Sequence, residues 1–185
     1  KCTWVRGNHD QWLADYIKTY YGKKEKSRSK MPPYQYNSFE LLSQRLTEVD
    51  MLNFADLILK LPLQKEAVID NTNYLFAHAM TSHSNVHKTT EYYLMGNMLF
   101  DTFLSEGVEG YTSMCGHTPT DNVIGNRGNH TYLDEDKHSI WKNEKENVFL
   151  LDCGCGFNSG RLACLCIETG QRYYSDGSIF KKKSD

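Results

Sequence analysis

The fold is decided by a stretch near the middle of the chain, Ala67-Val68-Ile69-Asp70-Asn71-Thr72-Asn73-Tyr74-Leu75-Phe76-Ala77-His78. Its two apolar runs, Ala67 to Ile69 and Asn73 to Ala77, are rich in the β-branched and aromatic residues that strands favour. The polar turn sequence Asp70-Asn71-Thr72 separates them. This pattern predicts a β-hairpin whose second strand ends at a histidine, His78.

Upstream of this hairpin, apolar residues recur with the spacing of helices. We expect helices over about Asp10 to Tyr21, Ser38 to Glu48 and Asp50 to Leu61, with Ser38 and Asp50 as caps and Gly22 and Pro62 as stops. Cys2 to Val5 predicts a strand that enters a core and ends at Arg6-Gly7. Lys23 to Lys30 holds five positive charges against Glu25 and is interpreted as an exposed, solvated linker.

Downstream of the hairpin, strands dominate. We expect one helix over about Thr89 to Leu104 and strands near Tyr111 to Cys115, Val148 to Asp152, Arg161 to Glu168 and Gln171 to Tyr174. Helices first and strands later, with some alternation, indicate an α/β fold in layers with a mixed sheet at its centre.

Size and composition indicate one domain over residues 1–185. The chain has 185 residues, 39% hydrophobic and 24% charged, with a net charge of -2, which gives no general attraction to nucleic acid. No stretch approaches the roughly 20 apolar residues of a membrane-spanning helix, and no signal peptide is evident. We therefore expect a cytoplasmic protein with reduced cysteines and no nucleic-acid or membrane partner. The first residue is Lys1, which suggests that an N-terminal portion is missing.

Three times a short run that is apolar or rich in β-branched residues ends in a histidine. The three stretches are Thr3-Trp4-Val5-Arg6-Gly7-Asn8-His9, Asn73-Tyr74-Leu75-Phe76-Ala77-His78 and Tyr111-Thr112-Ser113-Met114-Cys115-Gly116-His117. In layered α/β folds the loops beyond strand ends converge on the ligand crevice, so these side chains are expected to meet. Histidine and asparagine side chains suit Mn²⁺, Fe or Zn²⁺.

These motifs resemble those of a known family, the calcineurin-like metallophosphoesterases. The resemblance rests on Arg6-Gly7-Asn8-His9-Asp10, Phe76-Ala77-His78-Ala79 and Cys115-Gly116-His117-Thr118-Pro119, which occur in the family's order. Leu151 to Gly156 and Gly160 to Leu165 are similar to the closing strands of the bacterial serine/threonine protein phosphatase and diadenosine tetraphosphatase branch. The resemblance covers residues 1 to about 174 and implies a layered metallophosphatase sandwich with central mixed sheets and flanking helices, here without its first strands.

The resemblance also implies the site and its chemistry. Asn8, His78 and His117 would bind one of two divalent metal ions (Mn, Fe or Zn). His9 would be the catalytic residue that protonates or stabilises the departing alkoxide, after a hydroxide held between the metals attacks phosphorus. Asp10 is interpreted as a helix-start residue. The implied substrate is a phosphorylated protein or a small phosphoester.

Two departures from the family pattern limit the site. The family's earlier motifs, Asp-x-His and Gly-Asp-x-x-Asp-Arg-Gly, do not precede Arg6, so at most one metal site is partly built here. Between Ala79 and Gly116 there is no arginine to hold phosphate, only Lys88. We therefore expect the parent protein to be a phosphatase and this segment alone to be poorly active. Symmetric diadenosine tetraphosphate hydrolysis, or a truncated binding or regulatory module, are the alternatives.

Other candidate sites favour structural interpretations. Cys153, Cys155, Cys164 and Cys166 form two Cys-x-Cys pairs, too closely spaced for a typical zinc site, and are interpreted as core residues together with Leu162. His83 and His87 fall in a polar loop. His130 and His138 flank the acidic run Asp134-Glu135-Asp136 in what is interpreted as an exposed hairpin.

Overall fold

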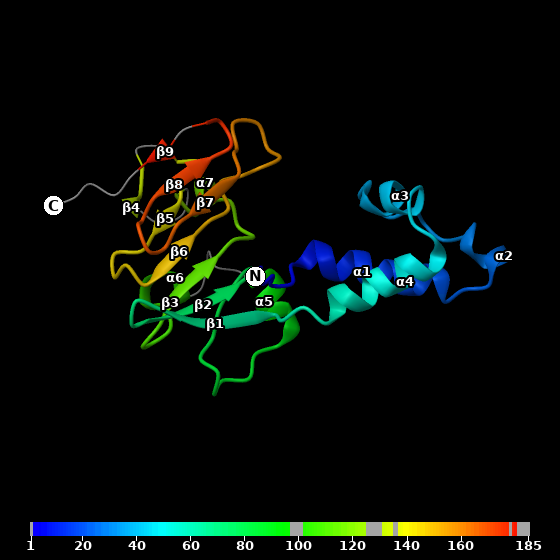
Figure 1. Ribbon diagram of the computed structural model, residues 1–185, viewed down its shortest axis with the longest axis horizontal. Helices are drawn as coiled ribbons and strands as arrows, with labels where there is room; N and C mark the ends of the chain where they lie inside the picture. Colours follow the sequence, from blue (N-terminus) through cyan, green and yellow to red (C-terminus); the bar gives the residue numbers. More distant parts are fainter. Residues whose placement is uncertain (1, 97–101, 125–130, 135–136, 178, 181–185) are drawn as a thin grey trace. The chain divides into compact units, whose positions relative to one another are not determined.

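The computed structural model describes residues 2–96, 102–124, 131–134, 137–177 and 179–180. Contacts within the chain divide it into two compact units, Lys1–Pro62 and Leu63–Asp185 (Figure 1). The single domain over residues 1–185 remains a prediction.

The first unit is helical, and two of its helices lie side by side (Figure 1). Its helices are α1 (Asn8–Tyr21), α2 (Glu25–Arg28), α3 (Ser38–Ser43) and α4 (Glu48–Leu59). Leu13, Ala14 and Ile17 of α1 are buried, as expected for positions three or four residues apart on one face. They pack in one cluster with the buried Met51, Ala55 and Ile58 of α4. The spacing of three or four residues that predicted the helices is thus also the spacing of the buried residues in this core.

Several boundaries differ from the prediction because the caps differ. Helix α4 begins after Thr47, whose side chain accepts the N–H of Asp50 while the Asp50 carboxylate accepts the Thr47 N–H. Asp50 is therefore the third residue of the helix and not its cap. Helix α3 follows Asn37 and stops at Ser43, so Ser38 is not a cap and the helix to Glu48 was wrong. The predicted Lys23–Lys30 linker is exposed but contains α2.

The strand predicted over Cys2 to Val5 was also wrong. Residues 2–7 have no regular secondary structure, and Trp4 is 62% exposed. The backbone N–H of Arg6 bonds the carbonyl of Pro62, at 2.9 Å. A strand needs a neighbouring strand for its N–H and C=O groups, and in the described part of the first unit there is no strand to provide one.

The second unit is built on a mixed six-stranded sheet with the order β1-β2-β3-β6-β5-β4. The strands are β1 (Gln64–Ile69), β2 (Thr72–Ala77), β3 (Thr112–Cys115), β4 (Thr131–Tyr132), β5 (Trp141–Lys142) and β6 (Val148–Leu150). The predicted hairpin is confirmed: β1 and β2 are antiparallel, and Asp70 and Asn71 turn between them with φ of 47° and 61°. Strands β2, β3 and β6 are parallel neighbours.

Helices cover one face of this sheet. The helices are α5 (Thr90–Met95), α6 (Phe103–Glu106) and α7 (Thr120–Ile124). Leu75, Cys115 and Leu150 of the sheet are in one buried cluster with Phe103 of α6 and Val123 of α7. The single helix predicted over Thr89 to Leu104 was wrong, because α5 ends at Met95 and Gly96 leaves the helical conformation. Residues 97–101 of that prediction lie outside the described residues.

A smaller antiparallel sheet has the order β7-β8-β9. Its strands are β7 (Ala163–Leu165), β8 (Arg172–Tyr174) and β9 (Ile179–Phe180). Ala163, Leu165 and Tyr174 cluster with Phe149 of β6 and with Ile140. Phe149 alternates along β6 with Val148 and Leu150, which face the helices. The second unit therefore has three layers, which are the helices, the large sheet and the small sheet. The predicted α/β class with a mixed sheet is confirmed.

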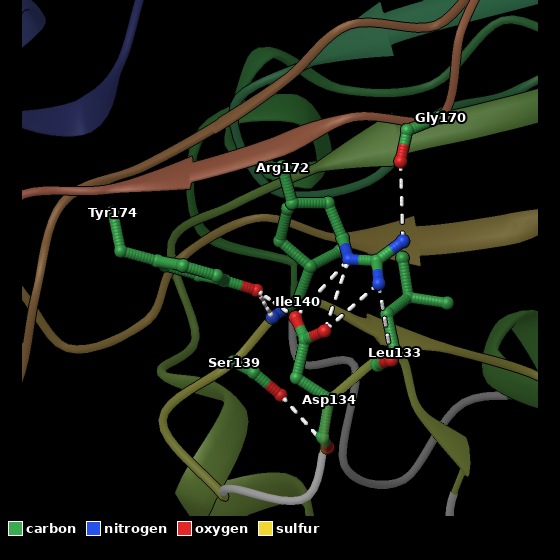
Figure 2. Close-up of polar contacts among 7 residues, drawn as sticks. All are labelled: Leu133, Asp134, Ser139, Ile140, Gly170, Arg172 and Tyr174. Carbon is green, nitrogen blue, oxygen red and sulfur yellow. Dashed lines mark hydrogen bonds and ion pairs between the residues drawn. The ribbon is translucent and has the colours of Figure 1, made fainter. Parts of the chain in front are cut away.

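A buried ion pair joins the β4–β5 connection to the small sheet (Figure 2). Arg172 Nη2 lies 2.8 Å from Asp134 Oδ1, and the two side chains are 11% and 4% exposed. The Tyr174 hydroxyl donates to Asp134 Oδ2 at 2.6 Å and accepts the N–H of Ile140 at 3.2 Å. Burial, reinforced by this bond to the carboxylate, raises the pKa of Tyr174. The exposed hairpin predicted around Asp134 was thus wrong at this residue; His130, Glu135 and Asp136 lie outside the described residues.

Candidate metal site

Two of the predicted ligands lie at one edge of the large sheet. Strand β2 ends at Ala77, directly before His78, and β3 ends at Cys115, two residues before His117. The two strands are parallel neighbours with Phe76 opposite Met114. Their carboxyl ends therefore reach the same edge, and the two histidines follow at almost the same level.

The two imidazole rings are in direct contact. Nε2 of His78 lies 3.2 Å from Nδ1 of His117, and the ring centroids are 5.1 Å apart at an interplanar angle of 62°. Both side chains are half-buried. Two nitrogen ligands held at about 2.0–2.1 Å by one tetrahedral ion lie about 3.3 Å apart. The spacing of this pair fits a shared proton and also fits a shared metal ion.

The backbone around Gly116 holds the pair in place. The Gly116 N–H donates to the His78 carbonyl at 2.8 Å. A Cβ at Gly116 would lie 3.5 Å from that carbonyl oxygen. His117 itself has φ of 68°, in the left-handed region that most residues avoid. This turn directs the chain sharply away from β3 and places the His117 ring against His78, and such backbone strain is common at functional sites.

Asp152 is a third polar residue at this edge that our prediction of the site did not include. It follows β6, the other parallel neighbour of β3, and its Cβ would lie 3.9 Å from a Cβ at Gly116. Its Oδ1 accepts the N–H of Gly154 at 2.9 Å, and its carbonyl accepts the N–H of Thr120. The signal in the sequence was the same as for the histidines, a polar residue just past an apolar run. Across the described residues, no three His, Cys, Asp or Glu side chains are grouped closely enough to hold a metal ion.

Asn8 and His9 lie in the first turn of α1, in the first unit. Asn8 is buried, whereas His9 is exposed. The His9 ring packs against the rings of Trp12 and Tyr36, with centroids 5.1 and 4.4 Å away. Because His78 and His117 belong to the second unit, convergence of all four residues remains a prediction.

Asp10 has the role at the start of the helix that was expected. Its Oδ2 accepts the N–H of Gly7 at 2.8 Å, just before the first helical residue. A carboxylate here also interacts favourably with the positive end of the helix dipole. Asp10 therefore fixes the turn that carries Asn8 and His9.

The six cysteines differ in burial, and Cys166 is only partly buried. Cys115 and Cys153 are buried, and burial raises the pKa of the Cys115 thiol, which makes it a poor nucleophile. Cys155 and Cys164 are exposed, and Leu162 is 64% exposed. The prediction that the four late cysteines pack in the core was therefore wrong for Cys155 and Cys164. Cys164 lies opposite the exposed Tyr173 of β8, so among the described residues this face of the small sheet is open to solvent.

His83 and His87 lie in the loop between β2 and α5, as predicted. His83 Nδ1 accepts the N–H of Asn85, and its ring packs edge-on against Tyr111. His87 is exposed. Among the described residues, neither His83 nor His87 joins His78 and His117 in a group that could hold a metal ion.

Comparison with known proteins adds no assignment: no protein-family model matches the sequence, and no significant match to a curated protein was found. Within the described ranges, no helix has both the length and the apolar character needed to cross a bilayer.

Proposed function

We propose that this chain is part of a metal-dependent phosphoester hydrolase of the serine/threonine protein phosphatase type, with a metallophosphatase-like sandwich fold. The observation that supports the proposal best is the contact between His78 and His117. These residues are separated by 39 positions in the sequence, yet their ring nitrogens lie 3.2 Å apart at the ends of parallel strands. Each of them also ends a short apolar or β-branched run in the sequence.

In the proposed site, His78, His117 and Asn8 are ligands of one divalent ion (Mn, Fe or Zn). When bound, such an ion neutralises phosphate charge and lowers the pKa of water. The chain's own residues do the remaining work. His78 and His117 would each offer one ring nitrogen to the ion as a neutral imidazole, with the proton that they share in the hydrogen bond moved to the other nitrogen of its own ring. Asp152 lies at the same edge and is available as a hydrogen-bond acceptor beside the pair.

His9 is the proposed proton donor to the leaving group. Its side chain is exposed and held by ring contacts with Trp12 and Tyr36. Histidine is the side chain most often used as a general acid, and an exposed ring on the first turn of a helix is accessible to a substrate. The substrate is a phosphorylated protein or a small phosphoester.

The proposal is tested first by metal binding. Isothermal titration of the purified chain with Zn²⁺ or Mn²⁺ is expected to show one site, whose affinity falls at least about tenfold in His78→Ala and in His117→Ala. His87→Ala is the matched control, since it removes an exposed histidine from the neighbouring loop. Equal affinity in all four proteins would contradict the metal site.

Activity is tested separately. The chain alone is expected to hydrolyse p-nitrophenyl phosphate poorly with Mn²⁺, because three neutral ligands do not hold a pair of ions. Turnover by a longer protein that carries both earlier motifs, lost in His9→Ala with metal affinity unchanged, would support the proposed role of His9. Metal binding without any turnover in that protein would favour the binding module instead.

A further inference from the structure

An aromatic groove runs along α1 in the first unit. It has a volume of about 380 Å³ and is lined by residues of α1, among them Trp12, Asp15 and Tyr16, and by residues 31–35. The groove is wide open, and its walls are mainly apolar. Asp15 is the charged side chain in its lining.

The segment after α2 forms the second wall by running back along α1. The Tyr16 hydroxyl donates to the Pro32 carbonyl at 3.0 Å, and the Tyr34 hydroxyl reaches the His9 carbonyl at 3.5 Å. Further along, the Tyr36 ring lies parallel to Trp12, with an interplanar angle of 5° and centroids 6.3 Å apart. His9 lies next to this end of the groove, because its ring contacts Tyr36 and also Trp12, which lines the groove.

The other end of the groove is positively charged. Residues 23–30 lead directly into the groove wall at Met31, and Lys23, Lys24, Lys26 and Lys30 are exposed. Arg28 is not available there, because its guanidinium binds both oxygens of Glu48, at 2.8 and 3.0 Å. In the part of the chain that the structure describes, the side chains of these four lysines have no ion-pair partner.

We propose that this groove binds a peptide with an apolar or aromatic side chain in its middle and acidic residues at the lysine end. The charges are complementary only in this arrangement, since Asp15 repels an anion within the groove while four lysines attract one beyond it. From His9 to Thr19, α1 rises about 15 Å, which an extended peptide covers in about five residues. In combination with the proposed function, on which this step rests, the substrate is a phosphoprotein with acidic residues about five to seven positions from the phosphorylated residue.

A nucleic acid fits the groove less well. Single strands need cations along the backbone and free ring faces for stacking, whereas the charged side chain inside the groove is acidic. Tyr16 is also committed to intramolecular packing, edge-on against Phe39 with centroids 4.8 Å apart. The groove thus favours a peptide.

The test is fluorescence anisotropy of the full chain with labelled, unphosphorylated peptides of ten residues. Each test peptide carries an aromatic residue and three consecutive glutamates that lie five to seven positions from a serine. Two versions are made, one with the glutamates before the serine and one with the glutamates after it. In the control peptides, glutamines replace the three glutamates. For one of the two versions, the glutamate peptide is expected to bind about tenfold more tightly than its glutamine control, because several weak surface ion pairs act together. This difference in affinity should shrink at high salt.

Matched variants locate the effect. Replacing Lys23, Lys24, Lys26 and Lys30 with glutamine should remove the preference for glutamate, whereas glutamine at Lys60, Lys65, Lys137 and Lys145, with the same change in net charge, should retain it. Equal binding of both peptides, or tighter lysine-dependent binding of a single-stranded oligonucleotide, would overturn the proposal. Because these peptides need neither phosphate nor metal, the binding result is independent of the phosphatase test. Peptide binding without any hydrolysis would support the groove as a peptide-binding site but not the phosphatase proposal.

Discussion

The two units of the molecule differ in how much of their core can be recognised from a short stretch of sequence. In the first unit, buried residues three or four positions apart mark one face of α1 and one face of α4, and these two faces pack together. In the second unit, β3 pairs with β2 and β6, and Asp134 binds Arg172 across 38 positions. Local periodicity therefore predicts the buried faces of α1 and α4, whereas the arrangement of the second unit depends on pairings that no short stretch of sequence contains.

The largest expected effect comes from breaking the long-range ion pair. Asp134→Ala leaves the Arg172 guanidinium buried without its carboxylate, and we expect a loss of about 3–5 kcal/mol in the free energy of unfolding of the second unit. Hydrogen exchange followed by mass spectrometry resolves the two units. Protection should fall in β5, β7 and β8 and stay unchanged in α1 and α4.

The control for this prediction lies in the first unit. Glu48→Ala removes the partner of Arg28, but this ion pair is open to solvent, with Glu48 46% exposed. Glu48→Ala should therefore lower the free energy of unfolding far less than Asp134→Ala, because water replaces the lost partner of Arg28. Similar losses of unfolding free energy in the two variants would show that the buried ion pair stabilises the protein no more than the exposed one.

A smaller effect is expected from the hydroxyl group that completes the same network. Tyr174→Phe removes the donor to Asp134 and should cost about 1.5–3 kcal/mol at neutral pH. The pKa of Tyr174 is raised in the folded protein, so its stabilising contribution is complete below the ordinary tyrosine pKa of about 10 and is lost as the pH rises through the folded value. In urea unfolding, the stability difference between wild type and variant should therefore narrow above about pH 10. A constant difference would mean that Tyr174 does not titrate with unfolding.

The smallest effect is expected at the cap of helix α4, in the first unit. Thr47→Ala removes the cap of α4 and should lower stability by about 0.5–2 kcal/mol. Ser38→Ala is the control, because Ser38 was predicted as a cap but lies inside α3. Thermal unfolding followed by circular dichroism compares the two. A larger loss for Ser38→Ala would favour the boundaries read from the sequence.

These comparisons explain what the sequence could predict. The hairpin with its turn at Asp70 and Asn71, helix α1 and strand β3 follow from local pattern and turn chemistry. The strand at Cys2 to Val5 does not form in the structure, although its composition resembles that of β2, because strand formation depends on a neighbour. Asp134 looked like part of a solvated acidic run, since its partner Arg172 lies far along the chain.

The candidate site shows the same division. The motifs selected His78 and His117, and parallel pairing of β2 with β3 brings them into contact. Asp152 follows the next parallel strand but was not singled out, because the order of strands in the sheet was unknown. The exposed face of β7 with Cys164 was predicted to be buried for the same reason, since alternation shows which residues share a face but not what covers it.

The central claim, that Asn8, His78 and His117 bind one ion beside His9, is tested most directly by paramagnetic broadening. Substoichiometric Mn²⁺ is added to the ¹⁵N-labelled chain, and the NMR signals of the histidine rings and of the Asn8 side-chain amide are followed. If the proposed site forms, the signals of Asn8, His9, His78 and His117 broaden selectively, whereas the signal of His87 remains sharp. Broadening of His78 and His117 while Asn8 and His9 stay sharp would contradict this claim.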